Sequence, residues 1–198
     1  MTMTAKKIGL AGKSGSGKDV VADYICERYG YKKIAVADAI REEVEIFLFN
    51  KLSGPPAVFD PINLEYNDAP KYNLVVEAFR KAVWAKPTTP EMRVLLQWWG
   101  TEYKRAQDNE YWIKCLVEKM PPDDFVVISD VRVPEEIDAI HQCGGEVWFV
   151  ERPGVAPVGI DNHLTEIGLE GAVFDRTLLN DQTLENLRQK VDFIFQEC

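Results

Sequence analysis

The chain has few cysteines, and their spacing excludes several kinds of site. The four of them are scattered along the 198 residues, at Cys26, Cys115, Cys143 and Cys198, with no C-x-x-C pair. Structural zinc sites, redox motifs and disulfide frameworks all need closely spaced or numerous cysteines. We therefore expect reduced thiols and a cytoplasmic protein.

Long hydrophobic runs are also missing. Residues 1–7 include lysines, but no apolar stretch with a cleavage site follows them, so no signal peptide is expected. No apolar run approaches the ~18 residues needed to cross a bilayer. The sequence therefore predicts that the protein has no membrane partner.

Positive charge and histidine are scarce. Lys and Arg number 23 against 32 Asp and Glu, which gives a net charge of −9. A nucleic-acid polymer is bound by neutralising many phosphates, so this balance excludes such a partner but allows a small phosphate ligand in one basic pocket. The two histidines, His141 and His163, have no Cys or Ser partner at motif spacing. A catalytic triad or metal cluster is not indicated, and we expect each histidine at the surface or in a cap.

What the chain does have is an alternation of short apolar runs and helical patterns. The apolar runs predict strands at residues 7–11, 34–37, 125–129, 147–150 and 177–179. Helices are expected between Gly17 and Gly30, over 39–50, from Pro134 to Gly144, and over 184–195. Two or three more helices are expected between 73 and 120, broken at Pro87, Pro90 and near Gly100, and a loop over 52–72. Strands that are apolar throughout predict a parallel sheet covered on both faces. The fold class is therefore α/β with three layers, a mostly parallel five-stranded sheet in one domain over 1–198, and a helical insertion over 39–120.

The most specific motif lies directly after the first predicted strand. Its residues are Gly12, Lys13, Ser14, Gly15, Ser16, Gly17 and Lys18, in the pattern G-x-x-x-x-G-K. Glycines at this spacing let backbone N–H groups cradle phosphates, the helix N-terminus adds positive potential, and the lysine reaches the β- and γ-phosphates. The alternative is a flexible Gly/Ser connection. The position between a strand and a helix favours phosphate binding.

Asp19 follows the lysine, where Ser or Thr usually binds Mg²⁺ through its hydroxyl group. A carboxylate can also bind a hard cation, directly or through water. The alternative is that Asp19 is only a favourable acid in the first turn of the helix. We favour the Mg²⁺ role.

Other candidates follow the third predicted strand or carry positive charge. Asp130 and Arg132 lie at the carboxyl end of that strand, where open α/β sheets bind ligands. Their alternatives are an N-cap for the helix at Pro134 and a surface ion pair. Arg93 and Arg152 are candidates to neutralise charge during phosphoryl transfer, the alternative for Arg93 being a solvent-exposed helix face.

Aromatic residues cluster between positions 98 and 112. They are Trp98, Trp99, Tyr103, Tyr111 and Trp112. Most are expected in the core, which is the usual place of aromatics at such spacing. Trp112 is the candidate to stack on a nucleobase.

Taken together, these residues resemble the phage-type deoxynucleoside monophosphate kinases of the P-loop kinase superfamily. The resemblance follows most of the chain in order. It comprises the loop with Asp19, then residues 37–41, 95–105 with 111–112, 129–136, 144–153 and 162–166. Relatives often carry Thr where this chain has Val20, so one hydroxyl contact is lost, and residues 52–85 match no motif.

The resemblance implies transfer of the γ-phosphoryl group of ATP to a deoxynucleoside 5′-monophosphate, with Mg²⁺. It implies catalytic roles for Lys18, Arg93, Asp130 and Arg132. ATP phosphates would be bound by the loop, Asp19, Val20 and Arg152, with Asp19 at the metal. The acceptor would be bound by Asp38, Arg41, Arg93, Gly100, Thr101, Trp112, Asp130, Arg132 and Glu136.

Two alternatives remain open at this point. One is a P-loop kinase for another small acceptor, of the dephospho-coenzyme A or phosphomevalonate type. The other is a nucleotide-binding module without transfer activity. Its best support is that Asp19 stands where Ser or Thr is usual. The accepted bases, discrimination of ribose from deoxyribose, and the oligomeric state, a homodimer included, also stay open.

Overall fold

A computed structural model describes residues 5–53, 69–86, 88–154, 169 and 171–197 of the chain. The chain divides into two compact units, Met1–Val36 with Trp112–Cys198, and Ala37–Tyr111. Each unit is described by itself below. Within the described ranges, no helix is both long enough and apolar enough to span a membrane.

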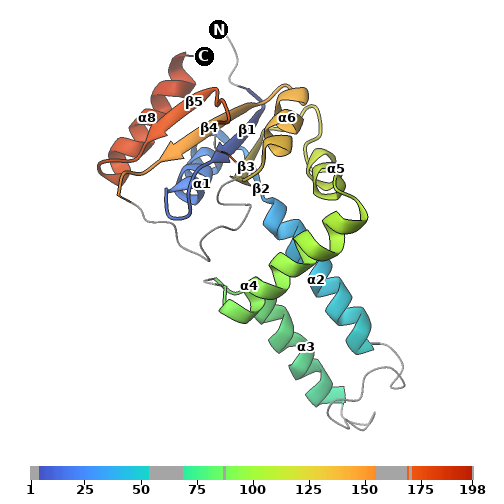
Figure 1. Cartoon of the computed structure of the whole chain (residues 1–198). Helices are drawn as coiled ribbons and strands as arrows, with labels where there is room; N and C mark the ends of the chain where they lie inside the picture. Colours follow the sequence, from blue (N-terminus) through green and yellow to red (C-terminus); the bar gives the residue numbers. More distant parts are fainter. Residues whose placement is uncertain (1–4, 54–68, 87, 155–168, 170, 198) are drawn as a thin grey trace. The chain divides into compact units, whose positions relative to one another are not determined.

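The first unit is built on a five-stranded sheet in the order β2-β3-β1-β4-β5 (Figure 1). The strands are β1 (Lys7–Ala11), β2 (Lys32–Ile34), β3 (Val126–Val131), β4 (Glu146–Glu151) and β5 (Arg176–Leu179). Every neighbouring pair is parallel. Every residue of β1 and β3 is buried, as expected for strands covered on both faces. The α/β fold class with a parallel five-stranded sheet is confirmed.

Helices cover both faces of this sheet. On one face, α1 (Lys18–Tyr29) and α8 (Leu184–Glu197) pack on alternate residues of the strands. The shared core includes Ile8, Leu10, Val127, Trp148, Val150, Leu178, Val21, Ile25, Leu187 and Val191. On the other face lies α6 (Pro134–Gln142), whose Ile140 contacts the position where Gly9 would carry a side chain. The result is the predicted arrangement of three layers (Figure 1).

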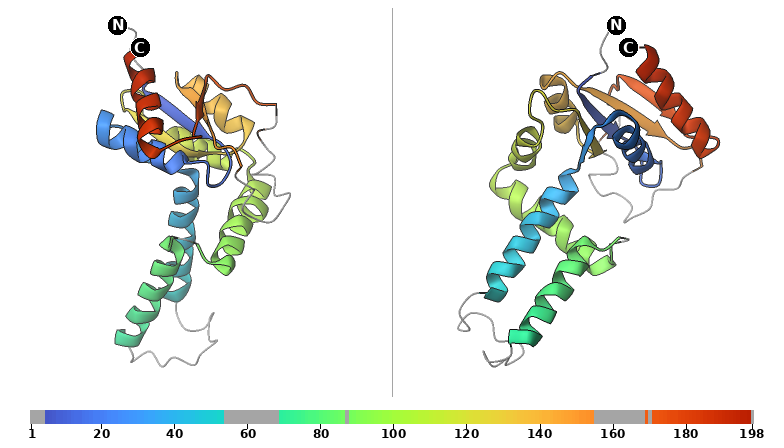
Figure 2. Two further views of the ribbon diagram at one scale, coloured as in Figure 1. Left: turned by 90° about the vertical axis from the view of Figure 1, so that its left-hand side faces the viewer. Right: turned by 180° about the vertical axis from the view of Figure 1, so that it is seen from behind.

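Helices make up the described part of the second unit (Figure 2). It contains most of α2 (Val36–Ser53), then α3 (Ala69–Trp84), α4 (Pro90–Gln97) and the π-helix η2 (Trp98–Arg105). The next helix, α5 (Tyr111–Glu118), leads back into the first unit. The α4 helix begins at Pro90, one of the predicted breaks. The Thr89 hydroxyl caps it by accepting a bond from the Met92 N–H, and proline occupies the first turn.

The predicted boundaries differ most from the structure at three places. The second strand ends at Ile34, and Val36 already begins α2, since the N–H of Val36 donates to Asp130 Oδ1 at 2.9 Å. Gly100 does not break the chain, because the π-helix continues through it. The predicted loop over 52–72 overlaps the end of α2 and the start of α3, and residues 54–68 lie outside the described ranges.

Candidate functional site

The glycine-rich segment forms the connection between β1 and α1. Gly12 has φ 137° and Gly17 has φ 107°, backbone conformations that a residue with a side chain rarely adopts. A Cβ atom on Gly12 would lie 2.3 Å from the carbonyl oxygen of Val150, so the loop is in close contact with β4. Glycine at position 12 is therefore required both by conformation and by space.

Lys18 begins α1 and spans the loop with its side chain. Its Nζ donates to the carbonyl oxygens of Gly12 at 2.6 Å and Lys13 at 2.9 Å. The Ser16 hydroxyl is buried under the loop, 3.0 Å from where a Gly12 Cβ would lie, and has no partner among the described residues. Val20, in the first turn of α1, is exposed. The ammonium group is thus held at the mouth of the loop, beside the N-terminus of a helix.

Asp19 has an exposed carboxylate beside this lysine. Its side chain is 74% exposed, and Oδ1 accepts a bond from Lys33 Nζ at 2.8 Å, which also binds Asp23 at 2.9 Å. In the described ranges, no group of three or more His, Cys, Asp or Glu side chains is placed so that it could hold a metal ion. A single carboxylate nevertheless fits Mg²⁺, because this ion is commonly bound by one or two carboxylates together with substrate phosphates and water.

The carboxyl end of β3 holds two of the predicted side chains. Asp130 is buried, and its Oδ1 caps the start of α2 through the N–H of Val36. The predicted alternative, a cap for the helix at Pro134, is met instead by Glu136, whose Oε2 accepts the N–H groups of Arg132 at 2.7 Å and Val133 at 3.3 Å. The Arg132 side chain is exposed.

Because all five strands are parallel, their carboxyl ends meet at one edge of the sheet. The loop follows β1, Arg132 follows β3, and Arg152, which is exposed, follows β4. Since β1 lies between β3 and β4, the structure brings these predicted residues together at adjacent strand ends. Such an edge, with a phosphate loop and two arginines, can bind a polyphosphate.

The second unit holds five of the predicted site residues. Asp38 lies in the first turn of α2, Arg93 is exposed on α4, and Gly100 and Thr101 lie within η2. Arg41 is buried and donates to the carbonyl oxygen of Val83 and to Thr88 Oγ1. Burial lowers the pKa of its guanidinium, and the nearby Asp38 carboxylate offsets this only in part.

Three predicted ligand-binding residues are buried in the structure. Arg41 joins α2 to the end of α3, and Glu136 is 2% exposed with its carboxylate bonded to backbone N–H groups. Trp112 is also 2% exposed. Trp98 and Tyr103, by contrast, are exposed and stacked on each other, with ring centroids 5.4 Å apart. The predicted motif at 162–166, with His163, lies outside the described ranges.

One residue of this site was missed by the sequence reasoning. Asn180 follows β5, and its Nδ2 donates to the carbonyl oxygen of Ser16 at 2.8 Å. Its backbone N–H donates to the Glu151 carbonyl at 2.7 Å, and a Cβ atom on Gly17 would lie 2.7 Å from Nδ2. The signal that could have found it is a polar residue directly after a parallel strand, at the same edge as the loop.

We predict that Asn180→Asp weakens ATP binding about tenfold. A carboxylate cannot donate to the Ser16 carbonyl and would repel it, which costs about 1–3 kcal/mol at a partly buried bond. Calorimetric titration with ATP measures the change. Asn186→Asp, in the first turn of α8, adds the same charge without removing a donor to Ser16 and should bind ATP as the parent does. Unchanged affinity in Asn180→Asp would show that the bond from Asn180 to the Ser16 carbonyl does not support ATP binding by the loop.

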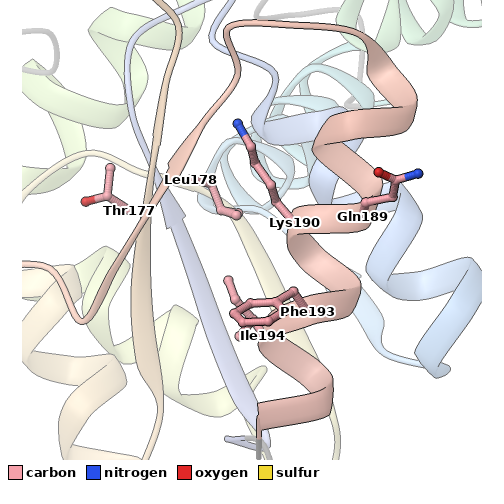
Figure 3. A pocket seen from close by; sticks show the side chains of 6 residues that line it. All are labelled: Thr177, Leu178, Gln189, Lys190, Phe193 and Ile194. Carbon is pink, nitrogen blue, oxygen red and sulfur yellow. The ribbon is translucent and has the colours of Figure 1, made fainter.

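A separate hollow lies between β5 and α8, with a volume of about 330 Å³ (Figure 3). Its lining is Thr177, Leu178, Gln189, Lys190, Phe193 and Ile194. The Lys190 ammonium is already bonded to the Leu179 carbonyl at 2.6 Å and to Asp181 at 3.0 Å. These bonds hold the turn that carries Asn180, so Lys190 has a structural role here.

His141 was expected at the surface or in a cap, and it is exposed. Its Nε2 lies 2.8 Å from Asp175 Oδ2, which also accepts the N–H of Val147. Burial alone would raise the pKa of Asp175, but these bonds outweigh it and hold the pKa below its ordinary value. The pair secures the start of β4 and takes no part in the strand-end site.

A family model and the sequences of known proteins place this chain in the same family. A sequence model described as deoxynucleotide monophosphate kinase matches residues 57–191. The deoxynucleotide monophosphate kinase of Escherichia phage RB69 is 25% identical, over 96% of this chain and 99% of that protein. A protein of Acanthamoeba polyphaga mimivirus, for which the same activity is proposed by name, is 30% identical over 93% of each chain.

Among solved structures, a dephospho-CoA kinase from Campylobacter jejuni is similar with a TM-score of 0.47. The two chains are 16% identical, over 97% of this chain and 96% of the other. A likeness at this level carries no conclusion about the acceptor.

Proposed function

Since the chain belongs to the deoxynucleotide monophosphate kinase family, we propose that it transfers the γ-phosphoryl group of ATP to a deoxynucleoside 5′-monophosphate. An oxygen of the acceptor phosphate attacks the γ-phosphorus, and the bond from that phosphorus to the β–γ bridging oxygen breaks. The products are ADP and the deoxynucleoside diphosphate. The observation that carries the proposal is the loop over residues 12–18, placed between β1 and α1 with Lys18 at its mouth.

The loop and its neighbours would hold the donor. Backbone N–H groups of the loop and the start of α1 would cradle the phosphates, and Lys18 would neutralise charge on the β- and γ-phosphates. Arg152, exposed after β4, would add a second positive charge. Mg²⁺, held by Asp19 and the phosphates, would supply further charge neutralisation.

Several of the predicted polar and charged side chains are proposed to bind the acceptor. Exposed guanidinium groups suit a phosphate, so Arg93 and Arg132 are proposed to bind and neutralise the transferring groups. Gly100, Thr101 and Asp38 are proposed to bind the monophosphate, and Asp130 remains proposed beside Arg132 as an orienting group. Catalysis would come from positioning and charge neutralisation, with little covalent chemistry by the protein.

The substrates of this proposal are free nucleotides, and the proposed compartment is the cytoplasm, that of the host if a phage encodes the chain. A net charge of −9 supports small phosphate ligands over a nucleic-acid polymer. A homodimer is compatible with all of these roles.

The test is product formation from Mg-ATP with dAMP, dGMP, dCMP and dTMP supplied separately. We expect a deoxynucleoside diphosphate from at least one of them, and the accepted bases define specificity. GMP and AMP in parallel reactions measure discrimination against ribose. ATP binding without any diphosphate product would discard this acceptor class. Dephospho-coenzyme A and phosphomevalonate would then be the next acceptors, and a binding role without transfer the remaining alternative.

A further inference from the structure

Glu43, near the middle of α2, is bonded by three side chains of the second unit. Its Oε2 accepts Trp99 Nε1 at 3.0 Å and Lys104 Nζ at 2.8 Å, and its Oε1 accepts the Tyr111 hydroxyl. Lys104 also lies 3.3 Å from the Tyr111 hydroxyl and 4.4 Å from the centre of its ring. None of these four residues has an assigned role in the proposed reaction.

Two of the donors lie on the π-helix, and their spacing depends on its form. Trp99 and Lys104 are five positions apart in η2. In an α-helix, five residues turn by about 500°, which leaves the two side chains about 140° apart around the axis. In a π-helix, with bonds from i to i+5, the wider turn brings such residues closer to one face. One carboxylate that binds both side chains therefore favours the π form over the α form.

The surroundings make these bonds strong. Glu43 and Lys104 are half-buried, with side chains 22% and 20% exposed, so water screens their attraction less than at a free surface. Burial alone would raise the pKa of Glu43, but the bonds from Lys104, Tyr111 and Trp99 outweigh it and hold the pKa below its usual value. The Trp99 ring packs on Phe47 of α2, with centroids 4.8 Å apart, and this contact adds to the attachment.

The π-helix that Glu43 binds contains residues proposed to bind the acceptor. Gly100 and Thr101 lie between Trp99 and Lys104 in η2. A change from π to α bonding displaces the residues that follow by one position, or about 100° around the axis. Such a rotation would move Thr101 relative to α2 within the second unit, whereas the phosphate loop belongs to the first.

We propose that Glu43 is a positioning residue for the acceptor: by binding Trp99 and Lys104 together, it selects the π-helical form of residues 98–105 and so sets the place of Gly100 and Thr101. The proposal rests on the proposed function for its kinetic consequence. Its structural part, the hold of Glu43 on η2, is independent of the reaction.

The experiment compares Glu43→Leu and Glu43→Gln with the parent chain. Leucine removes every bond. Glutamine keeps one acceptor oxygen, for either Trp99 or Tyr111, puts a donating NH2 group in place of the other oxygen, and loses the charge opposite Lys104. Hydrogen exchange of the amides of 98–105 is measured by mass spectrometry, and KM is measured separately for the acceptor and for ATP. We expect Glu43→Leu to speed the exchange and to raise the acceptor KM about tenfold or more, with the ATP KM within about twofold. The exchange rate and the acceptor KM of Glu43→Gln should lie between those of the parent chain and those of Glu43→Leu.

Two further variants complete the comparison. Glu91→Gln removes an exposed carboxylate of α4 in the same unit and should change neither KM by more than about twofold. Tyr111→Phe removes one donor and keeps the ring, so it tests the same network if Glu43→Leu does not fold. Its effects should have the direction of those in Glu43→Leu and be smaller.

The outcomes separate the two levels of the proposal. If hydrogen exchange of residues 98–105 is unchanged in Glu43→Leu, the proposal that Glu43 holds η2 is overturned. Faster exchange with an unchanged acceptor KM, or an equal rise in both KM values, overturns the positioning role and leaves a structural one. A parent chain that phosphorylates no deoxynucleoside monophosphate overturns the proposed function and with it the kinetic role, while the exchange data still decide whether Glu43 holds η2.

Discussion

Replacing Gly12 by alanine is expected to lower the melting temperature by about 5–15 °C and to abolish ATP binding. Two costs add at this position. Its φ of 137° strains any residue with a Cβ atom, and that atom would lie 2.3 Å from the Val150 carbonyl oxygen. Strain and overpacking together cost about 2–5 kcal/mol, and about 2–4 °C is lost per kcal/mol in a chain of this size. Differential scanning calorimetry and ATP titration measure the two effects.

Gly30 provides a matched control for the backbone strain alone. It ends α1 with φ 75°, and a Cβ atom there would meet nothing within 4 Å. Gly30→Ala should cost only about 1–2 kcal/mol and leave ATP binding unchanged. Equal stability of Gly12→Ala and Gly30→Ala, with ATP binding retained in Gly12→Ala, would contradict the close contact between the loop and β4.

Replacing Lys18 by methionine is expected to lower kcat/KM for phosphoryl transfer by about 10²–10³-fold. Methionine keeps much of the length of the side chain but removes the charge that would neutralise the β- and γ-phosphates. Stability should change little, because Lys18 is only half-buried and its bonds go to two loop carbonyls. Diphosphate formation with the best acceptor, followed at saturating and limiting ATP, measures the loss.

Lys32→Met is the control for this substitution. Lys32 is an exposed lysine of β2, outside the phosphate loop, so the same loss of charge there should leave kcat/KM within about twofold. A Lys18→Met enzyme with activity equal to that of Lys32→Met would remove Lys18 from the reaction. It would also favour a different arrangement of the phosphates from the one proposed.

The agreement between prediction and structure is best where local rules decide the outcome. The strand β1, the helix α1 and the loop between them follow from an apolar run, a G-x-x-x-x-G-K pattern and a terminal Gly30. The parallel sheet follows from strands that are apolar on both faces. Boundaries were less well predicted where a distant group decides them, as at Val36, whose N–H is capped by Asp130 from 94 positions away.

Side-chain roles were harder to predict than elements. Arg41 and Glu136 were predicted to bind the acceptor from the family resemblance, and Trp112 was also the candidate to stack on a base. The structure shows all three buried. A motif identifies which side chains could bind a phosphate, a sugar or a base. A motif does not show which of these side chains are already packed in the core or bonded as helix caps. The partners in such contacts come from other elements of the fold.

The sequence by itself determined the fold class, the phosphate loop and the reaction class, since glycine spacing, apolar runs and a motif order act over short stretches of chain. Tertiary structure alone decided which groups support the site. Asn180 binds the loop through Ser16, 164 positions away, and Glu43 joins α2 to both ends of a π-helical turn. Bonds of this kind depend on the distances and burial that folding creates between elements, and no local pattern of residues specifies them.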